Sequence, residues 1–370
     1  MRIPILHLID TLDAGGAQRM AVALVNGLDR RRFLPYLCAS RRGGALRSSV
    51  KTDVDYLCLS RRTSVDVSAF LVLISWIRRN GIKIIHAHST SLFLAAMAAM
   101  MVKDVRVIWH DHSGKGTSRN PWLYRLAMSK VELVVAVTPE LARWAIRRAN
   151  ARNAVYIRNF VEPPPKARTP MLPGAPDSRI VCVANFRPEK DLLTLLSAMR
   201  IIASHNSSAS LLLVGQALDA EYAAEVRDMI QKLNLGSRVF VLGSSRNVSA
   251  LLSQCAIGVL SSRVEGLPLA LLEYGQAGLA VVTTNVGQCH EVLDNETTGF
   301  LVEPGDFVRL AECVLRLLDD ASLRSRLATA LQRRVAGQYS AAAVLPELEA
   351  LYRRVLGIEP LAHRAGVAPA

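Results

Sequence analysis

Short apolar runs alternate with amphipathic runs along this chain, and the alternation occurs twice. In the first half, apolar runs that predict strands lie at 3–9, 35–38, 54–59, 82–86, 105–109, 133–137 and 154–157, with helical patterns at 17–28, 66–79, 91–102, 121–129 and 139–148. In the second half, strands are predicted at 179–183, 210–214, 239–242, 256–260, 280–283 and 300–302, with helices near 191–203, 219–233, 247–253, 268–277 and 306–318. Strands that alternate with helices form a parallel sheet covered on both faces. The sequence therefore predicts an α/β protein with two doubly wound halves.

A proline-rich segment separates the two halves. Residues 160–178 contain six prolines, which is typical of a linker. A chain of 370 residues is also too long for one ordinary core. We expect a first domain at 1–165 and a second at 175–338, with a final helix at about 340–358 that packs back onto the first domain. Two such domains are expected to form a cleft that holds the site.

The cysteines and the apolar stretches bear on the compartment. The six cysteines are scattered, with no Cys-x-x-Cys pair, which predicts reduced core residues rather than disulfides or zinc ligands. The start of the chain reads as a strand rather than a signal peptide. The longest apolar stretch, 92–102, is too short to cross a bilayer. We expect a cytoplasmic protein, at most peripheral at the inner face of the cell membrane.

The charge is concentrated in the first half. Residues 1–160 hold 25 Lys and Arg against 10 Asp and Glu, whereas the remainder holds 20 against 21. This asymmetry indicates an anionic partner for the first domain, either nucleic acid or an anionic membrane. The recurrent Arg pairs have no aromatic residues between them, which argues against nucleic acid. The segment 115–130 combines Lys and Arg with Trp122, Leu123 and Tyr124, which suits a membrane interface as well as an ordinary buried helix.

Two carboxylates lie at a predicted strand end in the second half. Glu265 follows the strand at 256–260, and Glu273 lies in the next helix. Ligands bind at this edge of open α/β sheets, and a carboxylate there can accept hydrogen bonds from the hydroxyls of a ribose or a hexose. For two such residues in isolation, a solvated loop Glu and a helix-surface Glu are the more common interpretation.

Two other loops carry groups suited to an anionic or sugar ligand. Gly15 and Gly16 open the first helix, where close backbone approach and the helix N-terminus favour an anion, although they do not form the spaced glycine pattern of a dinucleotide binder. In the second half, Arg187 and Lys190 lie in a strand-to-helix loop and could neutralise a diphosphate.

Histidines end two strands of the first half, in the pairs His86/His88 and His110/His112. A metal site needs three or four converging ligands, and no cysteine or further carboxylate is spaced to complete one, so we predict no metal. A single histidine that positions or polarises a sugar fits this edge better.

The ordered set of motifs resembles glycosyltransferase family 4, which has the GT-B fold of two Rossmann-like domains. The Glu-x7-Glu segment 265–273, with Gly266 and Pro268, is similar to that family's signature. Gly-Gly-Ala-Gln-Arg (15–19), the His after the fifth strand, Arg-Asn-Phe-Val (158–161), Arg-Pro-Glu-Lys (187–190), 242–248 and the 286–291 segment follow in the family's order. The resemblance covers roughly residues 3 to 356 and implies a retaining enzyme that uses a nucleotide-sugar donor.

The resemblance also implies site residues. The catalytic set would be His112, Glu265, Arg187 and Lys190, with His110 as the fallback for His112. The donor-binding set would be Gly15, Gly16, Arg187, Lys190, Gly243, Glu265, Gly287, Gln288 and Glu273. In these roles Glu273 holds the ribose and Glu265 faces the sugar, while Arg187 and Lys190 bind the diphosphate. The family usually has Arg where this chain has Asn185, and Glu is common where it has Gln18.

The resulting expectation is a transferase that moves a sugar from a UDP- or GDP-sugar to a hydroxyl of a glycan or lipid-linked acceptor in cell-surface polysaccharide synthesis. It would transfer a hexosyl or N-acetylhexosaminyl group without a cofactor or metal. The alternatives are a sugar-nucleotide epimerase or phosphorylase of the same fold, and a sugar-binding protein without catalysis. Partners would be the nucleotide sugar, the acceptor and an anionic membrane surface, with no nucleic acid.

Overall fold

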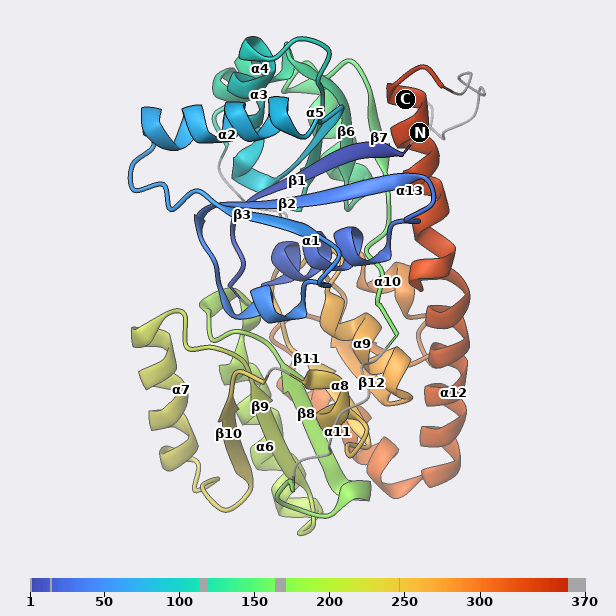
Figure 1. The fold of residues 1–370 in the computed structure, drawn as a ribbon. Helices are drawn as coiled ribbons and strands as arrows, with labels where there is room; N and C mark the ends of the chain where they lie inside the picture. Colours follow the sequence, from blue (N-terminus) through green and yellow to red (C-terminus); the bar gives the residue numbers. More distant parts are fainter. Residues whose placement is uncertain (1, 14, 113–118, 164–170, 246, 359–370) are drawn as a thin grey trace. The chain divides into compact units, whose positions relative to one another are not determined.

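The computed structural model describes residues 2–13, 15–112, 119–163, 171–245 and 247–358 (Figure 1). The chain forms two compact units. The first comprises Met1–Glu162 together with Ala341–Ala370, and the second comprises Pro163–Ser340. Residues 164–170 of the predicted linker lie outside the described part of the chain.

The first unit is built on a seven-stranded sheet in the order β3-β2-β1-β4-β5-β6-β7, with every pair of neighbours parallel. The strands are β1 (Ile3–Thr11), β2 (Phe33–Arg42), β3 (Asp55–Cys58), β4 (Ile84–His88), β5 (Arg106–Asp111), β6 (Val131–Ala136) and β7 (Ala154–Tyr156). The helices are α1 (Gly16–Gly27), α2 (Val67–Arg79), α3 (Leu92–Met101), α4 (Pro121–Met128), α5 (Pro139–Arg147) and α13 (Ala341–Val355).

The two faces of this sheet carry different helices. Successive strand residues point to opposite faces, so Leu8 and Ile9 of β1 mark the two sides. Leu8 packs in a core with side chains of α2, α3, α4 and α5, whereas Ile9 packs with side chains of α1. Helix α13 contacts α1 and joins this second face. Figure 1 shows α2 and α1 on opposite sides of β1 and β2.

The second unit contains a six-stranded parallel sheet in the order β10-β9-β8-β11-β12-β13. Its strands are β8 (Arg179–Val183), β9 (Ser210–Val214), β10 (Val239–Gly243), β11 (Ile257–Leu260), β12 (Ala280–Thr284) and β13 (Phe300–Val302). Its helices are α6 (Leu192–His205), α7 (Ala220–Lys232), α8 (Val248–Leu252), α9 (Leu269–Ala277), α10 (Cys289–Val292), α11 (Phe307–Asp319) and α12 (Ala321–Gln338). The order reverses between β8 and β11, which defines the point where open sheets bind ligands.

Tight packing fixes α9 beside this reversal. The ring of Tyr274 lies against Gly258 of β11, where a Cβ atom would come within 2.5 Å of the ring. The Tyr274 hydroxyl accepts a hydrogen bond from the Val183 amide at the end of β8, at 2.6 Å. On the outer side of α9, the absence of a side chain at Gly275 lets Val335 and Leu331 of α12 pack against the helix backbone. Helix α9 is therefore held between the sheet and α12.

The α/β class and the doubly wound sheets are confirmed, and every predicted strand is present. Helix α12 was not predicted, because its few buried residues form a narrow stripe among many polar ones: Leu327, Ala328, Leu331 and Val335. The final helix predicted at about 340–358 is present as α13, Ala341–Val355.

Two further sequence expectations concern cysteines and membranes. All six cysteines are free thiols, and four of them are buried. Among the described residues, no helix has both the length and the apolar content needed to span a bilayer.

Candidate active site

Two loops of the second unit meet through an ion pair at the reversal of the sheet. Lys190 lies in the loop after β8, and Glu265 lies in the loop after β11. The Lys190 Nζ donates a hydrogen bond to Glu265 Oε1 at 2.8 Å. The Glu265 side chain is 9% exposed and that of Lys190 is 23% exposed. The strand order therefore brings together the carboxylate and the cation that the sequence analysis singles out.

Residues that the sequence analysis did not single out hold this pair in place. The Ser262 hydroxyl donates to the same oxygen of Glu265 at 2.6 Å. The Thr284 hydroxyl, at the end of β12, donates to the Ser262 carbonyl at 2.6 Å. Both hydroxyls follow apolar strands, so polar residues that end adjacent strands are the signal that could have identified them.

A second ion pair joins the same two loops. Asp191 is 2% exposed and caps α6, with its backbone in the left-handed region at φ 47°. Its carboxylate accepts from Arg263 Nε at 2.8 Å. The Arg263 amide also donates to the Glu189 carbonyl at 2.8 Å. These bonds fix the backbone on either side of the Lys190–Glu265 pair.

A third loop, after β12, lies directly against the loop of Glu265. Gly287 has φ 56°, and a Cβ atom there would lie 2.3 Å from the Glu265 carbonyl oxygen. The amide of Gln288, which is 2% exposed, donates to the Gly266 carbonyl at 2.8 Å. Only glycine fits this position, because both the space and the backbone conformation exclude a side chain. The predicted residues Gly287 and Gln288 thus belong to the same edge as Glu265.

Three further predicted residues of this unit lie on α9, in the loop after β8 and at the end of β10. Glu273 is half-buried on α9, next to the anchored Tyr274. Arg187 is about half exposed and lies 3.7 Å from the Glu189 carboxylate. Gly243 ends β10, two strands from β8, and its carbonyl accepts from the Gly215 amide.

Asn185 occupies the position where the family usually has Arg. Its side-chain oxygen accepts from the Gln216 amide at 3.0 Å and so joins the loops after β8 and β9. At Gly215 a Cβ atom would lie 1.9 Å from the Ala184 carbonyl oxygen. The loops after β8 and β9 are therefore closely packed, and the Asn185 side chain forms a hydrogen bond between them.

In the first unit, Gly15 and Gly16 lie at the N-terminus of α1, and the histidines lie at the ends of β4 and β5. Gly15 is the N-cap residue, with extended backbone, and nothing lies within 4 Å of the place where a Cβ of Gly16 would be. Space is therefore open beside Gly16, whereas at Gly15 a Cβ atom would lie 2.4 Å from the Gln18 side-chain oxygen. The approach of a donor to these two glycines stays a prediction.

Five histidines cluster on the α13 face of the first sheet. They form two hydrogen-bonded chains, and the ring of His86 in one chain stacks on those of His7 and His88 in the other. His88 joins His7, with Nε2 3.1 Å from Nδ1, and joins His112, with Nδ1 2.9 Å from Nε2. His86 joins His110, with Nε2 3.1 Å from Nδ1, and its own Nδ1 lies 2.6 Å from the Tyr352 hydroxyl. His7 was not predicted to belong to this group, because a single histidine inside an apolar strand gives no separate signal.

Burial keeps these imidazoles neutral. It lowers the pKa of His7 to about 3 and that of His112 in the same direction. The pKa values of His86, His88 and His110 are lowered well below 6.5, first by burial and then by neighbouring histidines. Of the two candidates for the functional histidine, His112 keeps more exposure than His110.

Ligand atoms of His86, His88 and His110 lie within 4.8 Å of one another. However, both ring nitrogens of His86 and both of His88 already lie within hydrogen-bonding distance of protein partners. A metal ion would have to displace those contacts without a carboxylate in the group to offset its charge. The geometry favours a hydrogen-bonded network, and the absence of a metal stays a prediction.

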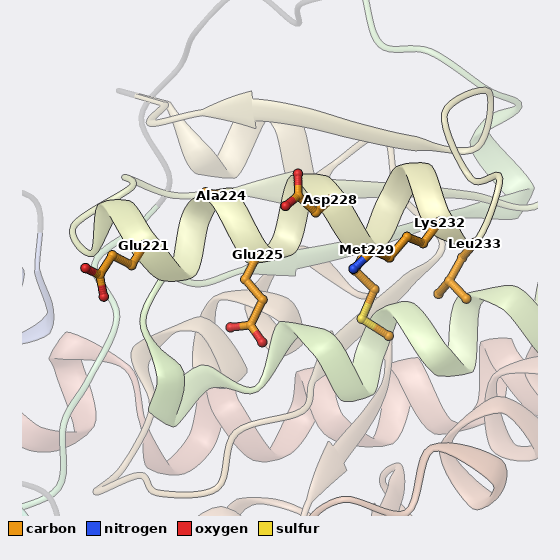
Figure 2. Close-up of a pocket in the computed structure, with 7 residues that line it drawn as sticks. All are labelled: Glu221, Ala224, Glu225, Asp228, Met229, Lys232 and Leu233. Atoms are coloured by element: carbon orange, nitrogen blue, oxygen red, sulfur yellow. The ribbon is translucent and has the colours of Figure 1, made fainter.

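A shallow hollow of about 590 Å³ lies along α7, away from these loops. Figure 2 shows its lining: Glu221, Ala224, Glu225, Asp228, Met229, Lys232 and Leu233. None of the predicted site residues lines it. Its three carboxylates make it a poor place for a diphosphate.

Two family models match most of the chain. The model for Glycosyltransferase Family 4 matches residues 14–163, and the model for Glycosyl transferases group 1 matches residues 172–334. The chain belongs to glycosyltransferase family 4, with the GT-B fold. Both matches fall on the regions of the two sheets, so the family membership rests on both units.

Curated relatives of this family 4 chain are glycosyltransferases and related enzymes. It is 29% identical over 177 residues to N-acetyl-alpha-D-glucosaminyl L-malate synthase of Bacillus anthracis, covering 48% of this chain and 45% of that protein. It is 25% identical over 317 residues to alpha-D-kanosaminyltransferase of Streptomyces kanamyceticus, covering 76% and 81%. The matched stretch spans less than half the length of the Bacillus anthracis protein.

Solved structures share the fold at low sequence identity. Anabaena Alr3699/HepE in complex with UDP and glucose superposes with a TM-score of 0.78 at 17% identity, covering 94% of this chain and 98% of that one. Sucrose-phosphate synthase from Thermosynechococcus elongatus superposes with a TM-score of 0.77 at 19% identity, covering 97% and 100%. These likenesses confirm the GT-B fold of the family 4 chain.

Proposed function

We propose that this protein transfers a sugar from a nucleotide-diphosphate donor to a hydroxyl of a glycan or lipid-linked acceptor, in polysaccharide or glycolipid synthesis. The observation that carries the proposal is the Lys190–Glu265 pair, set among three loops at the reversal of the second sheet. At this edge a cation can bind a diphosphate, and a carboxylate can accept hydrogen bonds from sugar hydroxyls. Membership of family 4 supports the same reaction class.

The donor is proposed to be a UDP- or GDP-sugar that carries a hexose or an N-acetylhexosamine. Support for UDP comes from the Anabaena protein, whose structure is a complex with UDP and glucose. In our proposal Glu273 accepts hydrogen bonds from the ribose hydroxyls, and Gly243 lies beside the base. The backbone at Gly287 and Gln288 approaches the sugar or the phosphates, because no side chain at Gly287 obstructs it.

The reaction is proposed to retain the anomeric configuration. The acceptor oxygen forms a bond to the anomeric carbon on the face from which the diphosphate leaves, as the bond from that carbon to the phosphate oxygen breaks. The acceptor's proton passes to the departing phosphate oxygen. Lys190 and Arg187 would neutralise the charge that develops on the diphosphate, without a metal ion. Glu265 and His112 are proposed to contact the sugar.

We also propose a cytoplasmic location with peripheral attachment to the inner face of the cell membrane. The excess of positive charge in residues 1–160 supports attraction to anionic lipid. Such attachment would bring the enzyme to a lipid-linked acceptor.

The test is nucleotide release from a panel of UDP- and GDP-sugars, measured with and without glycan or lipid-linked acceptors. We expect release that depends on the acceptor and a glycosylated product that keeps the donor's anomeric configuration. Lys190→Ala should lower turnover by about a hundredfold, the size typical of removing one group that stabilises developing charge. The matched control is Lys232→Ala, which removes an exposed lysine on α7.

Each alternative predicts a different result. An epimerase would convert the donor sugar without transferring it to an acceptor, and a phosphorylase would require inorganic phosphate. A sugar-binding protein would bind the donor without releasing nucleotide. Full activity in Lys190→Ala would refute the proposed site even if transfer occurs.

A further inference from the structure

The helix layer on one face of the first unit exposes a concentration of large apolar side chains. Among the described residues of 1–162, every well-exposed large hydrophobic lies on α2, α3, α4 or α5, or in the loop that leads into α2. They are Val65, Val67, Leu71, Val72, Met97, Met100, Met101, Trp122, Leu123, Leu126 and Ile146. The opposite face, which carries α1, has none of them. We call this set the apolar helix face.

Helix α3 is apolar on both sides. Its sequence, Leu-Phe-Leu-Ala-Ala-Met-Ala-Ala-Met-Met, contains no charged or polar side chain. Ala95 and Ala98 face the core, whereas Met97, Met100 and Met101 are 44%, 62% and 55% exposed. A helix that is hydrophobic all round is ordinarily buried, so the outer side of α3 indicates a missing apolar partner.

The apolar helix face is continuous across three helices. Arg78 at the end of α2 donates to the Met101 carbonyl at the end of α3, at 2.9 Å. Between α3 and α4, the rings of Phe93 and Tyr124 have centroids 5.4 Å apart. Trp122 on α4 is 74% exposed. Exposed apolar residues on neighbouring helices thus form one patch rather than scattered positions.

Cations border this patch. The four helices contain five arginines, Arg78, Arg79, Arg125, Arg143 and Arg147, and a single carboxylate, Glu140. Lys103, Arg106 and Lys130 follow the ends of α3 and α4, together with two carboxylates, Asp104 and Glu132. Glu132 lies 3.6 Å from Arg106, so the net charge of these positions is positive. Since these helices all connect parallel strands, their C-terminal ends share one edge of the unit, and the cations gather there.

We propose that the apolar helix face docks on the surface of an anionic lipid bilayer. The methionine, leucine and tryptophan side chains enter the interface, and the bordering Lys and Arg contact lipid phosphates. The reason for such docking rests on the proposed function, since a lipid-linked acceptor lies in the membrane. From the sequence, only the segment 115–130 was predicted to contact a membrane. Residues 115–118 of that segment lie outside the described residues. The structure adds the exposed apolar residues of α2 and α3.

Charge argues for lipid over a second copy of the chain. A symmetric dimer through this face would place the cationic edges of both copies in one interface with a single carboxylate from each set of helices. Anionic phosphates complement those edges, and a bilayer also accepts the flexible methionines without a fixed shape.

The experiment is co-flotation of the full chain with vesicles of phosphatidylcholine that contain phosphatidylglycerol, compared with vesicles of phosphatidylcholine alone. We expect binding to the anionic vesicles that weakens as salt rises, because surface charge is screened. The triple variant Met97→Gln, Met100→Gln and Leu126→Gln should reduce the bound fraction at least fivefold. Met171→Gln, Val308→Gln and Phe307→Gln, together in one variant, are the matched control on the second unit and should bind normally.

A second pair of variants tests the charge. Arg79→Gln with Lys103→Gln should weaken binding to anionic vesicles, whereas Arg227→Gln with Lys232→Gln, on α7, should not. We expect each variant to remain folded, because all the replaced side chains are exposed. Thermal unfolding of each variant checks this.

Several outcomes would overturn the proposal. They are no flotation of the wild type at low salt, equal flotation with both kinds of vesicle, and full binding by the triple variant. A dimer in solution that the triple variant dissociates would assign the face to a second copy instead. The assay uses no donor sugar, so it separates loss of docking from failure of the proposed transfer reaction, which is measured with a soluble acceptor.

Discussion

Lys190 and Glu265 form an ion pair in which the stability of each charge is expected to depend on the other. A carboxylate that is 9% exposed needs a partner, because removing the cation from a buried pair leaves a costly unpaired charge. The Ser262 hydroxyl offsets part of that cost, since it donates to the same oxygen. In the donor complex we expect Lys190 to exchange part of this contact for the diphosphate.

A double-mutant cycle measures this dependence. We expect Lys190→Met and Glu265→Gln to show a coupling of about 0.5–3 kcal/mol in the free energy of unfolding, the range found for residues in contact. Chemical denaturation of the wild type, both single variants and the double variant gives the value. Additive effects of the two changes would mean that the ion pair contributes nothing.

Gly287 permits the contact between the third loop and the loop of Glu265. Gly287→Ala should destabilise the chain by about 1–3 kcal/mol, because the new Cβ meets backbone oxygen and the φ of 56° suits glycine. Gly236→Ala is the control, since nothing lies within 4 Å of a Cβ there. Equal melting temperatures for Gly287→Ala and the wild type would contradict this account of the loop.

At the scale of elements, strand order decides which groups meet. The loops after β8, β11 and β12 converge because these strands are neighbours in the sheet. In the first unit, the neighbours β1, β4 and β5 bring five histidines together, and Tyr352 ties helix α13 to them. Helix α13 is thereby attached to the first sheet by a polar contact as well as by packing.

The histidine network predicts that the first unit is sensitive to acid. The folded pKa of His7 is about 3, below its ordinary value of 6.5, so the unfolded chain binds protons that the folded unit does not. The stability that the unit gains from keeping this histidine neutral is therefore fully present above pH 6.5. It is lost as the pH falls from 6.5 toward 3. Each such histidine contributes a slope of up to about 1.4 kcal/mol per pH unit.

Tryptophan fluorescence can follow this loss selectively, because all four tryptophans, Trp76, Trp109, Trp122 and Trp144, belong to the first unit. Denaturation midpoints should fall steeply with pH below 6.5, and His7→Phe should reduce the slope. His205→Phe, at an exposed position on α6, is the control. A midpoint that does not change between pH 6.5 and mildly acidic pH would contradict the account.

At the scale of the whole molecule, the alternation of apolar runs was enough to predict both sheets. The pattern also predicted that Lys190 and Glu265 lie at the carboxyl edge, because each lies in the segment between a strand and the next helix. Their pairing could not be predicted, because the alternation predicts the strands but not their order in the sheet, in which β8 lies next to β11. His7 was missed for the same reason, because its hydrogen-bond partner, His88, lies on a neighbouring strand.

The motif order predicted the family, which the matches to residues 14–163 and 172–334 confirm. The roles of the individual residues remain proposals, and so do the donor, the acceptor and the retention of configuration. Asn185 is the departure that bears most directly on the donor site, because its amide braces two loops at the position where the family usually has Arg.

The most direct test of the central claim is calorimetric titration of the full chain with UDP and with GDP, repeated with Glu273→Ala. We predict saturable binding of one nucleotide per chain, weakened by about tenfold or more in Glu273→Ala, the loss expected for hydrogen bonds to a charged group. The control, Glu225→Ala on α7, should bind as the wild type does. Absence of binding for both nucleotides, or equal affinity in Glu273→Ala, would contradict the proposed donor site.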